Sequence, residues 1–411
     1  MKPEKGAYAA LVGLVLAGAA QCSRANQGTP DGASDGTSGS PPAPSALVLN
    51  APPTTSPVIA LHNLDADIAD REKRAARGEP NAPVELVSYY LVRAKYVGRV
   101  ADLIAADTTS AGFVATRDGD AKAHLTRAKV LSAIHEFAAA QKELDRAAAL
   151  KGRDPDIDVD GERAVILLAV GREDEAGALL TPVDRASPSD LVMRGGVEAR
   201  LGHAAESDRL FELARAKYRD VSAFTVAGMD FEHSRALELG GDRAKARAYL
   251  SEAATVMPTY AHAVVHLASL EPPDRALPRL EALEKSSDDP DVLGGEADAL
   301  RRAGRAADAA AMTARARARF VEVLARLPRA YADHAASFYL GMGGDPQRAV
   351  ILAHANAENR PTDEAVELWL TAGQAAGSHE ETCAAARRAL GLEHATSGLR
   401  ERAASAVKGC P

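Results

Sequence analysis

The sequence predicts an all-α protein in which helix-turn-helix units stack into a solenoid. Three observations predict this fold class. The composition is 46% hydrophobic with only 4% aromatic residues, which indicates a core of Ala, Leu and Val suited to closely packed helices. From Asn63 onward, apolar residues recur at helical spacing in blocks that Gly, Pro or Asp interrupt. The interruptions return about every 35 residues, a period typical of repeat architectures.

The N-terminal segment, residues 1–21, is predicted to be an export signal. Two lysines precede an uncharged run from Gly6 to Gln21 that has Leu and Val at its centre and small residues at its end. This run is shorter than the ~20 residues that a membrane-spanning helix needs. The stretch LAGAAQC resembles the lipobox of a bacterial lipoprotein signal, and the resemblance implies lipid attachment at Cys22. Simple cleavage near Ala19 or Ala20 is the alternative.

Residues 22–57 are predicted to form a disordered linker. They are rich in Gly, Ser, Thr, Pro and Asp, so they cannot bury enough apolar surface to order themselves. A flexible chain of this length has an end-to-end distance of about 30–35 Å. The linker would therefore tether the folded part at a distance from a membrane surface.

Residues 58–120 are predicted to be a helical N-terminal cap or a degenerate first repeat. They include the hairpin-like stretch VELVSYYLVRAKYVGRVADLIAAD, whose register is poor. Residues 396–411 are predicted to contain a capping helix at the other end. Both predictions follow from the need of a repeat array to cover the apolar face of each terminal unit.

Residues 121–395 are predicted to contain about eight repeats. The turn inside each repeat is marked by His135, Gly171, Gly202, Gly241, Glu271, Gly304, Gly344 and Gly377. Five residues after every marker comes a small residue: Ala140, Ala176, Ser207, Ala246, Ala276, Ala309, Ala349 and Thr382. Most of the residues nine positions after the markers are bulky and apolar, as in Leu144, Leu180 and Leu250. One helix thus ends at each marker, and a second helix follows with a repeated packing face.

This register resembles the tetratricopeptide repeat (TPR), a 34-residue helix-turn-helix. The segments GREDEAGALLTPVDRASP, GGDRAKARAYLSEAATVMP and GGDPQRAVILAHANAENRP carry the resemblance best. It implies a concave groove, lined by the first helices, that holds a peptide or a partner helix. In this register the groove residues would be Arg235, Glu238, Asp298, Tyr331, His334, Phe338 and Glu367.

Two groups of residues raise the question of a metal site. Asp156, Asp158 and Asp160 alternate before a glycine, as in the first half of a calcium loop, but the twelfth position is Leu167 where a closing Glu is needed. The register instead places these acids at the start of a helix, where they meet the positive end of its dipole. His262 and His266 share a helix face, but the sequence shows no third ligand near them. We therefore predict no metal at either place.

Two further features have a structural and a functional interpretation. Cys383 and Cys410 are the only cysteines beyond the signal, and in an exported protein they predict a disulfide that joins the last repeat to the capping helix. The run from Arg301 to Arg329 is strongly basic, which predicts a solvated helix face or, alternatively, a site for an acidic peptide or an envelope polymer.

The sequence as a whole favours a binding function over catalysis. The net charge of -8 argues against nucleic acid as the main partner. No common nucleophile, phosphate-loop or dinucleotide motif occurs, so we expect neither an enzyme nor a cofactor. We expect a scaffold in the bacterial cell envelope that binds a protein or peptide and is anchored through Cys22. The alternatives are a structural protein that binds an envelope polymer and, less favoured, a metal-binding protein.

Overall fold

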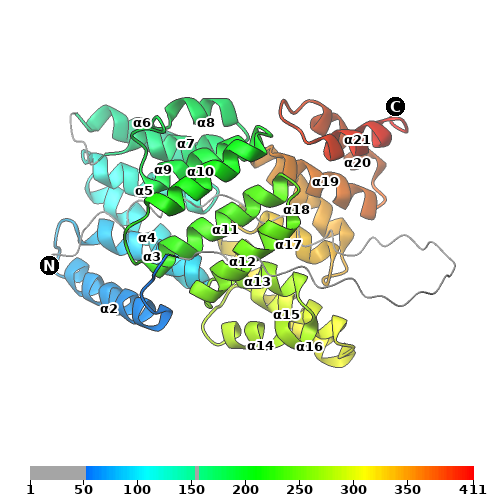
Figure 1. Ribbon diagram of the computed structural model, residues 1–411, viewed down its shortest axis with the longest axis horizontal. Coiled ribbons are helices and arrows are strands. Elements are labelled where there is room, and N and C mark those ends of the chain that lie inside the picture. Colours follow the sequence, from blue (N-terminus) through cyan, green and yellow to red (C-terminus); the bar gives the residue numbers. More distant parts are fainter. Residues whose placement is uncertain (1–51, 153–156) are drawn as a thin grey trace.

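A computed structural model describes residues 52–152 and 157–411, and these residues form twenty α-helices and no strand (Figure 1). The predicted signal peptide, Cys22 and most of the linker lie outside the described residues. At the end of the predicted linker, residues 52–56 have no regular secondary structure, and the Thr55 amide donates to the carbonyl of Val221 at 2.7 Å. Within the described ranges, no helix is both long and apolar enough to span a bilayer.

Three helices precede the repeats, and one follows them. They are α2 (Pro57–Ala76), α3 (Ala82–Val97), α4 (Val100–Thr116) and α21 (Ser397–Val407). Between them lie sixteen helices in eight consecutive pairs: α5 (Ala121–Ala133) and α6 (Phe137–Leu150), α7 (Val159–Ala169) and α8 (Glu173–Leu179), α9 (Pro188–Arg200) and α10 (Ala204–Lys217), α11 (Ala223–Leu239) and α12 (Arg243–Val256), α13 (Ala261–Leu270) and α14 (Pro273–Glu284), α15 (Pro290–Arg302) and α16 (Ala306–Arg326), α17 (Ala332–Leu340) and α18 (Pro346–Asn359), α19 (Asp363–Ala375) and α20 (His379–Leu390). The fold is an α-solenoid of TPR-type helix-turn-helix units, as the sequence predicted.

The turn inside each repeat depends on a residue in the left-handed backbone region. Seven of the eight predicted markers have a positive φ, and six of these are glycines that adopt it without a steric cost. The seventh is His135, with φ of 58°, the only residue other than glycine among those described that has a positive φ. Glu271 is the exception: its backbone is extended, and Pro272 and Pro273 start the next helix directly.

The small residues of the register lie where the two helices of a repeat cross. Seven of the eight predicted positions are buried: Ala140, Ala176, Ser207, Ala246, Ala276, Ala309 and Ala349. Helix lengths explain the irregular spacing of the markers. The short spacing from Gly241 to Glu271 contains α13, which has only 10 residues, and the long spacing from Gly304 to Gly344 contains α16, which has 21.

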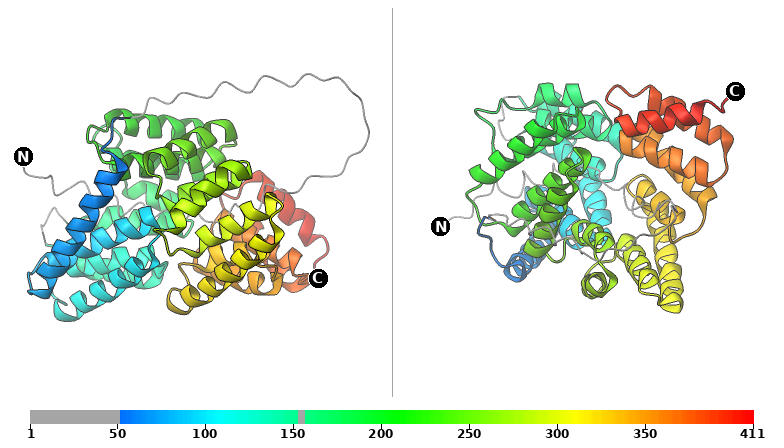
Figure 2. Two further views of the ribbon diagram at one scale, coloured as in Figure 1. Left: turned by 90° about the horizontal axis from the view of Figure 1, so that it is seen from below. Right: turned by 45° about the vertical axis from the view of Figure 1, so that its right-hand side comes forward.

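The two halves of the solenoid share hydrophobic cores. One core joins residues of α4 to α7, such as Leu125 and Leu144, to residues of α16 to α21, such as Phe320 and Trp369. A second core joins α2 and α3 to helices α11 to α16. In the right-hand view of Figure 2, the cyan helices of the N-terminal segment accordingly lie near the middle of the molecule. The chain thus curves back until its N-terminal helices close part of its own concave side.

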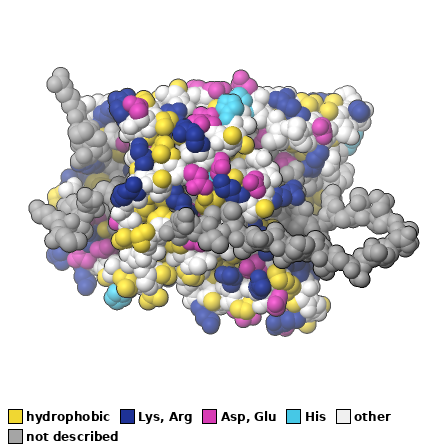
Figure 3. Space-filling model, viewed as in Figure 1, with side chains coloured by type: hydrophobic (Ala, Val, Ile, Leu, Met, Phe, Trp, Pro, Cys, Tyr) yellow, Lys and Arg dark blue, Asp and Glu magenta, His cyan; other side chains and the backbone are white. Residues whose placement is uncertain are grey.

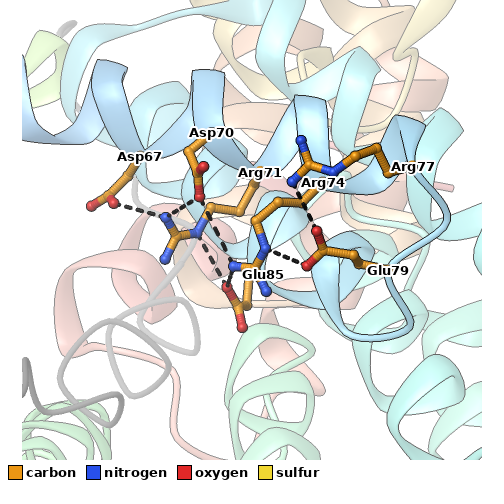
Figure 4. A network of polar contacts seen from close by, with 7 residues as sticks. All are labelled: Asp67, Asp70, Arg71, Arg74, Arg77, Glu79 and Glu85. Atoms are coloured by element: carbon orange, nitrogen blue, oxygen red, sulfur yellow. Dashed lines mark hydrogen bonds and ion pairs between the residues drawn. The ribbon is translucent and has the colours of Figure 1, made fainter.

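A network of ion pairs joins the first two described helices. Glu85 of α3 accepts hydrogen bonds from Arg71 and Arg74 of α2, each at 3.1 Å (Figure 4). Arg74 also donates to Glu79 in the connecting turn at 2.7 Å. Exposed ion pairs contribute little singly, but a connected group holds two helices in one register. The network therefore stabilises the helical hairpin of α2 and α3, which forms the start of the N-terminal cap.

The acidic stretch marks a helix start, as its register predicted. Asp158 is the N-cap of α7, and its carboxylate accepts the Gly161 amide at 2.9 Å. A side chain on Gly161 would collide with that carboxylate, because its Cβ would lie 2.2 Å from Asp158 Oδ2. Asp160 lies in the first turn, whereas Asp156 is outside the described residues. A helix cap thus accounts for the Asp-Gly pattern in the sequence.

We expect Asp158→Ala to lower the free energy of unfolding by about 0.5–2 kcal/mol, because it removes the cap. Asp160→Ala is the matched control and should cost less, about 0.3–1 kcal/mol, since only an interaction with the helix dipole is lost. Urea unfolding measures both. Calcium should leave the melting temperature unchanged. A calcium-dependent rise in wild type that Asp158→Ala abolishes would contradict the cap interpretation.

The capping helix α21 is attached by the predicted disulfide. Cys383 in α20 is bonded to Cys410 just after α21, with a Cα–Cα distance of 5.7 Å. Two side chains of α21, Leu399 and Ala403, are buried in the core that also contains α20. The bond therefore limits fraying of the last helix away from the array.

We expect Cys410→Ser to lower the free energy of unfolding by about 2–4 kcal/mol, as is typical of a disulfide that closes a loop of this size. Hydrogen exchange should show the loss of protection first in α21, because the bond attaches that helix. Alkylation of the unfolded protein before reduction should leave Cys383 and Cys410 unmodified. Modification of both thiols under those conditions would show that the bond does not form.

Candidate functional site on the inner face

The first helices of the repeats bring charged residues together on the concave side, which we call the inner face. Its members are Arg200, Glu232, Arg235, His262, His266, Asp291, Asp333, His334 and Glu364. Residues far apart in sequence meet here: Arg200 of α9 donates to Glu364 of α19 at 3.1 Å. The charge of Arg235 on α11 acts on His266 of α13 and on Glu364. Helices from α9 to α19 therefore face one common space.

Three side chains form what we call the inner histidine cluster: His262 of α13, Asp291 of α15 and His334 of α17. One ligand-type atom from each lies within 4.8 Å of the other two, and all three side chains are half-buried. His334 Nδ1 is hydrogen-bonded to Asp291, and the two imidazole centroids are 5.5 Å apart. The three residues occupy the first turns of the first helices in three consecutive repeats, and stacking of the repeats brings them together.

The two histidines of the cluster have opposite electrostatic surroundings. Burial disfavours a charge on His334, but the carboxylates of Asp291 and Asp333 outweigh it and raise its pKa to about 10. Burial, with a smaller contribution from the positive charge of His334, lowers the pKa of His262 to about 4. At neutral pH the cluster thus contains one imidazolium and one neutral imidazole.

Two ion pairs are buried behind this cluster. Arg360 lies 3.4 Å from Asp333, and both side chains are almost fully buried. Burial opposes the charge of Glu364, yet Arg200 more than compensates and lowers the Glu364 pKa to about 2. Removing one member of such a pair is costly because a buried charge stays behind. Next to the histidine cluster, the inner face therefore consists of paired charges that hold one another in place.

A second part of the inner face surrounds Glu232. Its carboxylate is buried 3.9 Å from Lys95 of α3, a helix of the N-terminal cap. The rings of Tyr96 and Tyr260 pack beside it with centroids 4.7 Å apart, and neither hydroxyl has a hydrogen-bond partner among the described residues. Burial raises the Glu232 pKa to about 7, although Lys95 opposes the shift. The N-terminal cap thus completes the electrostatics of the inner face.

The predicted groove residues fall into two groups. Arg235, Glu238, Asp298, His334 and Glu367 are half-buried and carry the polar character that a groove needs. Arg235 is paired with Glu238 at 2.8 Å, and Glu367 with Arg402 of α21 at 2.7 Å. The prediction is wrong for Tyr331 and Phe338. Both are only 7% exposed: the Tyr331 hydroxyl donates to Asp289, and the Phe338 ring packs against Phe320 of α16 with centroids 4.8 Å apart.

The sequence missed the partners that complete the histidine cluster. His262 and His266 were expected to share a helix face without a third ligand, but the fold adds His334 and Asp291 to His262. Asp333, Arg200 and Glu364 were also missed. The sequence did contain a usable signal. Residues in the first turns of successive first helices stack in the solenoid, so a comparison of these positions could have brought His262, Asp291 and His334 together.

The basic run is largely neutralised by its own neighbours. Arg302 donates to Asp298 at 2.9 Å, Arg319 to Asp288 at 2.9 Å, and Arg329 to Glu136 at 2.8 Å. Arg317 instead donates to the carbonyl of Gly343 at 2.5 Å. On the face shown in Figure 3, basic and acidic side chains are likewise interspersed. The solvated-face interpretation fits these contacts better than an anion site does.

Comparisons with known proteins yield structural similarities only. No family model matches the sequence, and no curated protein matches it. The chain is similar to a chain of the APC/C hetero-tetramer Cut9–Hcn1, at 12% identity and a TM-score of 0.40, over 80% of this chain and 63% of that one. It is also similar to the C-terminal part of a TPR repeat-containing protein from Cytophaga hutchinsonii, at 15% identity and a TM-score of 0.30. That match covers 58% of this chain and 98% of the other.

This chain therefore spans less than two thirds of the Cut9–Hcn1 chain that it matches. The TPR-type fold is established by the helix pairs and the turn register described above.

Glu232 predicts a pH dependence of stability. The pKa of Glu232 is about 7 in the folded state, above its ordinary value of 4.5. Between these two pH values, the native state therefore holds a proton that the unfolded chain has lost. The stability from this carboxyl is complete below pH 4.5 and is lost as pH rises through 7. As the pH rises from about 5 to about 8, the free energy of unfolding should therefore fall by about 1–2 kcal/mol less in Glu232→Gln than in wild type. Glu401→Gln, at an exposed position of α21, is the control. Identical pH profiles for wild type and Glu232→Gln would contradict a buried, protonated carboxyl.

Proposed function

We propose that this chain is a non-enzymatic scaffold that binds a peptide or protein segment along its inner face. One observation carries the proposal: half-buried charged residues from the first helices of successive repeats follow one another on the concave side. An extended segment has backbone donors and acceptors at regular intervals, and a row of charged side chains matches them. Binding along several repeats also spreads the contact over a long surface.

Some ion pairs of the inner face can be exchanged for contacts with a bound peptide, which supports the proposal. Arg235 and Glu238 are three residues apart on α11 and satisfy each other at 2.8 Å, while Asp298 is held by Arg301 at 2.7 Å. The Asp298–Arg301 pair is the more exposed of the two, so an arriving peptide can replace either partner with its own charged or amide groups at small net cost. The fully buried pair of Arg360 with Asp333 remains and keeps its helices in position, and Arg200 stays paired with the buried Glu364.

The proposed location is the bacterial cell envelope, with a lipid anchor on Cys22. Support comes from the lipobox-like stretch and from the polar linker that follows it. A disulfide between Cys383 and Cys410 also suits an oxidising compartment. An anchored scaffold of this kind would hold its partner near a membrane surface. Radiolabelled fatty acid that is incorporated into wild type but not into Cys22→Ala would test the anchor.

The polymer-binding alternative has weaker support. Arg302, Arg319 and Arg329 already donate to carboxylates of the same chain, so an acidic polymer would have to displace these partners. Retention on purified cell-wall polymer that fades with salt would favour this alternative. The inner face carries the better-supported binding surface.

Site-specific photocrosslinking in cells tests the scaffold. We expect a crosslinker at Glu238 or Glu367 to trap one defined partner, because both residues lie at the half-buried border of the inner face. Ile351, 69% exposed on the second helix of its repeat, is the control position and should trap none. The substitution Arg235→Gln should reduce the adduct at Glu367 at least tenfold, and a melting curve checks that this variant folds. Equal adducts at Ile351, or none at the inner positions, would contradict the proposal.

A further inference from the structure

The inner histidine cluster has the composition of a metal site. It combines two imidazoles and one carboxylate, from His262, His334 and Asp291, on three successive first helices. Three protein ligands of this kind, with remaining positions open to solvent or substrate, are typical of sites for Zn²⁺ and related divalent ions. All three residues are half-buried, so none is sealed completely from solvent.

The surroundings of the cluster contain a group that would orient one ligand. His334 Nε2 faces Asp333 Oδ1 at 3.9 Å, on the ring edge opposite the nitrogen that meets Asp291. A metal-ligating histidine commonly directs its second nitrogen to such a carboxylate, which sets the tautomer and ring orientation. Asp333 is itself held by Arg360 at 3.4 Å and is almost fully buried. The cluster thus has an outer layer as well as ligands.

The local charge also favours a cation. Asp289, Asp291 and Asp333 place three carboxyl groups around the cluster, and Tyr331 donates to Asp289 at 3.2 Å. Arg360, through Asp333, and Lys95, near His262, are positive charges that act on this group, and a bound ion would replace the proton of His334. An ion pair between His334 and Asp291 accounts for those two side chains only. The ring of His262 lies beside that of His334, with centroids 5.5 Å apart.

We propose that His262, Asp291 and His334 bind one divalent transition-metal ion of the Zn²⁺ class, with Asp333 orienting His334. The ligand atoms already lie within 4.8 Å of one another, so small side-chain rotations bring them to the ~2.0–2.2 Å bonds that Zn²⁺ forms with nitrogen and oxygen. The remaining coordination positions hold water or a ligand side chain from a bound partner. The ion would clamp α13, α15 and α17 together at the inner face. This inference does not depend on the scaffold proposal, because it concerns the chain alone.

The test is a Zn²⁺ titration of the purified full-length chain after treatment with a chelator, in competition with a chromophoric chelator. We expect one ion per chain. His262→Ala and His334→Ala should each lower the affinity at least tenfold, and Asp333→Asn should lower it about 10–100-fold as an outer-layer change. Co²⁺ in place of Zn²⁺ should give visible absorption bands that His262→Ala removes.

His266→Ala is the matched control, because His266 lies one turn further along α13 and is also half-buried. It should leave Zn²⁺ affinity within about twofold of wild type. Melting curves without metal check that each variant folds, and His262→Gln replaces His262→Ala if the smaller side chain destabilises the core. Absence of one-to-one binding, or equal affinity in His262→Ala and His266→Ala, would overturn the site. Binding that survives the double substitution of His262 and His334 would place the ion elsewhere, for example at Asp208, Glu212 and His233, and would also overturn it.

Discussion

The contact between residues 98–101 and the turn before α15 governs how this solenoid is closed. The Asp288 carboxylate accepts the Val100 amide at 2.6 Å, and the Gly98 carbonyl accepts the Asp288 amide at 3.1 Å. Gly98 has a φ of 65°, and a Cβ on it would lie 2.5 Å from Ser287 Oγ, so only glycine allows this approach. The helices on either side of Gly98 are thereby fixed against the repeats nearly 190 residues later in the chain.

Closure has an electrostatic consequence for the inner face. Once α3 packs against α13, charges that an open groove would leave in water become buried and must find partners within the chain. Arg200 and Glu364 meet across the concave side, and Lys95 of the cap meets Glu232 of the fourth repeat. Burial lowers the pKa of His262, whereas the carboxylates of Asp291 and Asp333 outweigh burial and raise the pKa of His334. The inner face thus combines deeply buried paired charges, such as Arg360 with Asp333, with a more exposed carboxylate at Glu238.

The repeat register was predictable because its requirements are local. A left-handed turn favours glycine, and the helix crossing favours a small side chain; Gly171 with Ala176 and Gly241 with Ala246 show both rules in the structure. His135 obeys the same register without being glycine, and its ring nitrogen is hydrogen-bonded to the Arg329 carbonyl at 3.2 Å, a contact that no local pattern contains. Of the residues predicted to line a groove, Arg235 and Glu238 are half-buried, whereas Tyr331 and Phe338 are buried against neighbours from adjacent helices.

The sequence by itself determined the helical class, the eight hairpins, the start of α7 at Asp158 and the pair of cysteines that a disulfide joins. Each of these depends on neighbours within about one repeat, so spacing and residue type suffice to predict it. Only the tertiary structure decided that His262, Asp291 and His334 converge and that the N-terminal cap supplies part of the inner face. The superhelical path is the sum of small rotations at every hairpin, and it is altered by the short α13 and the long α16. The meeting of residues from distant repeats depends on that sum, which no single stretch of sequence contains.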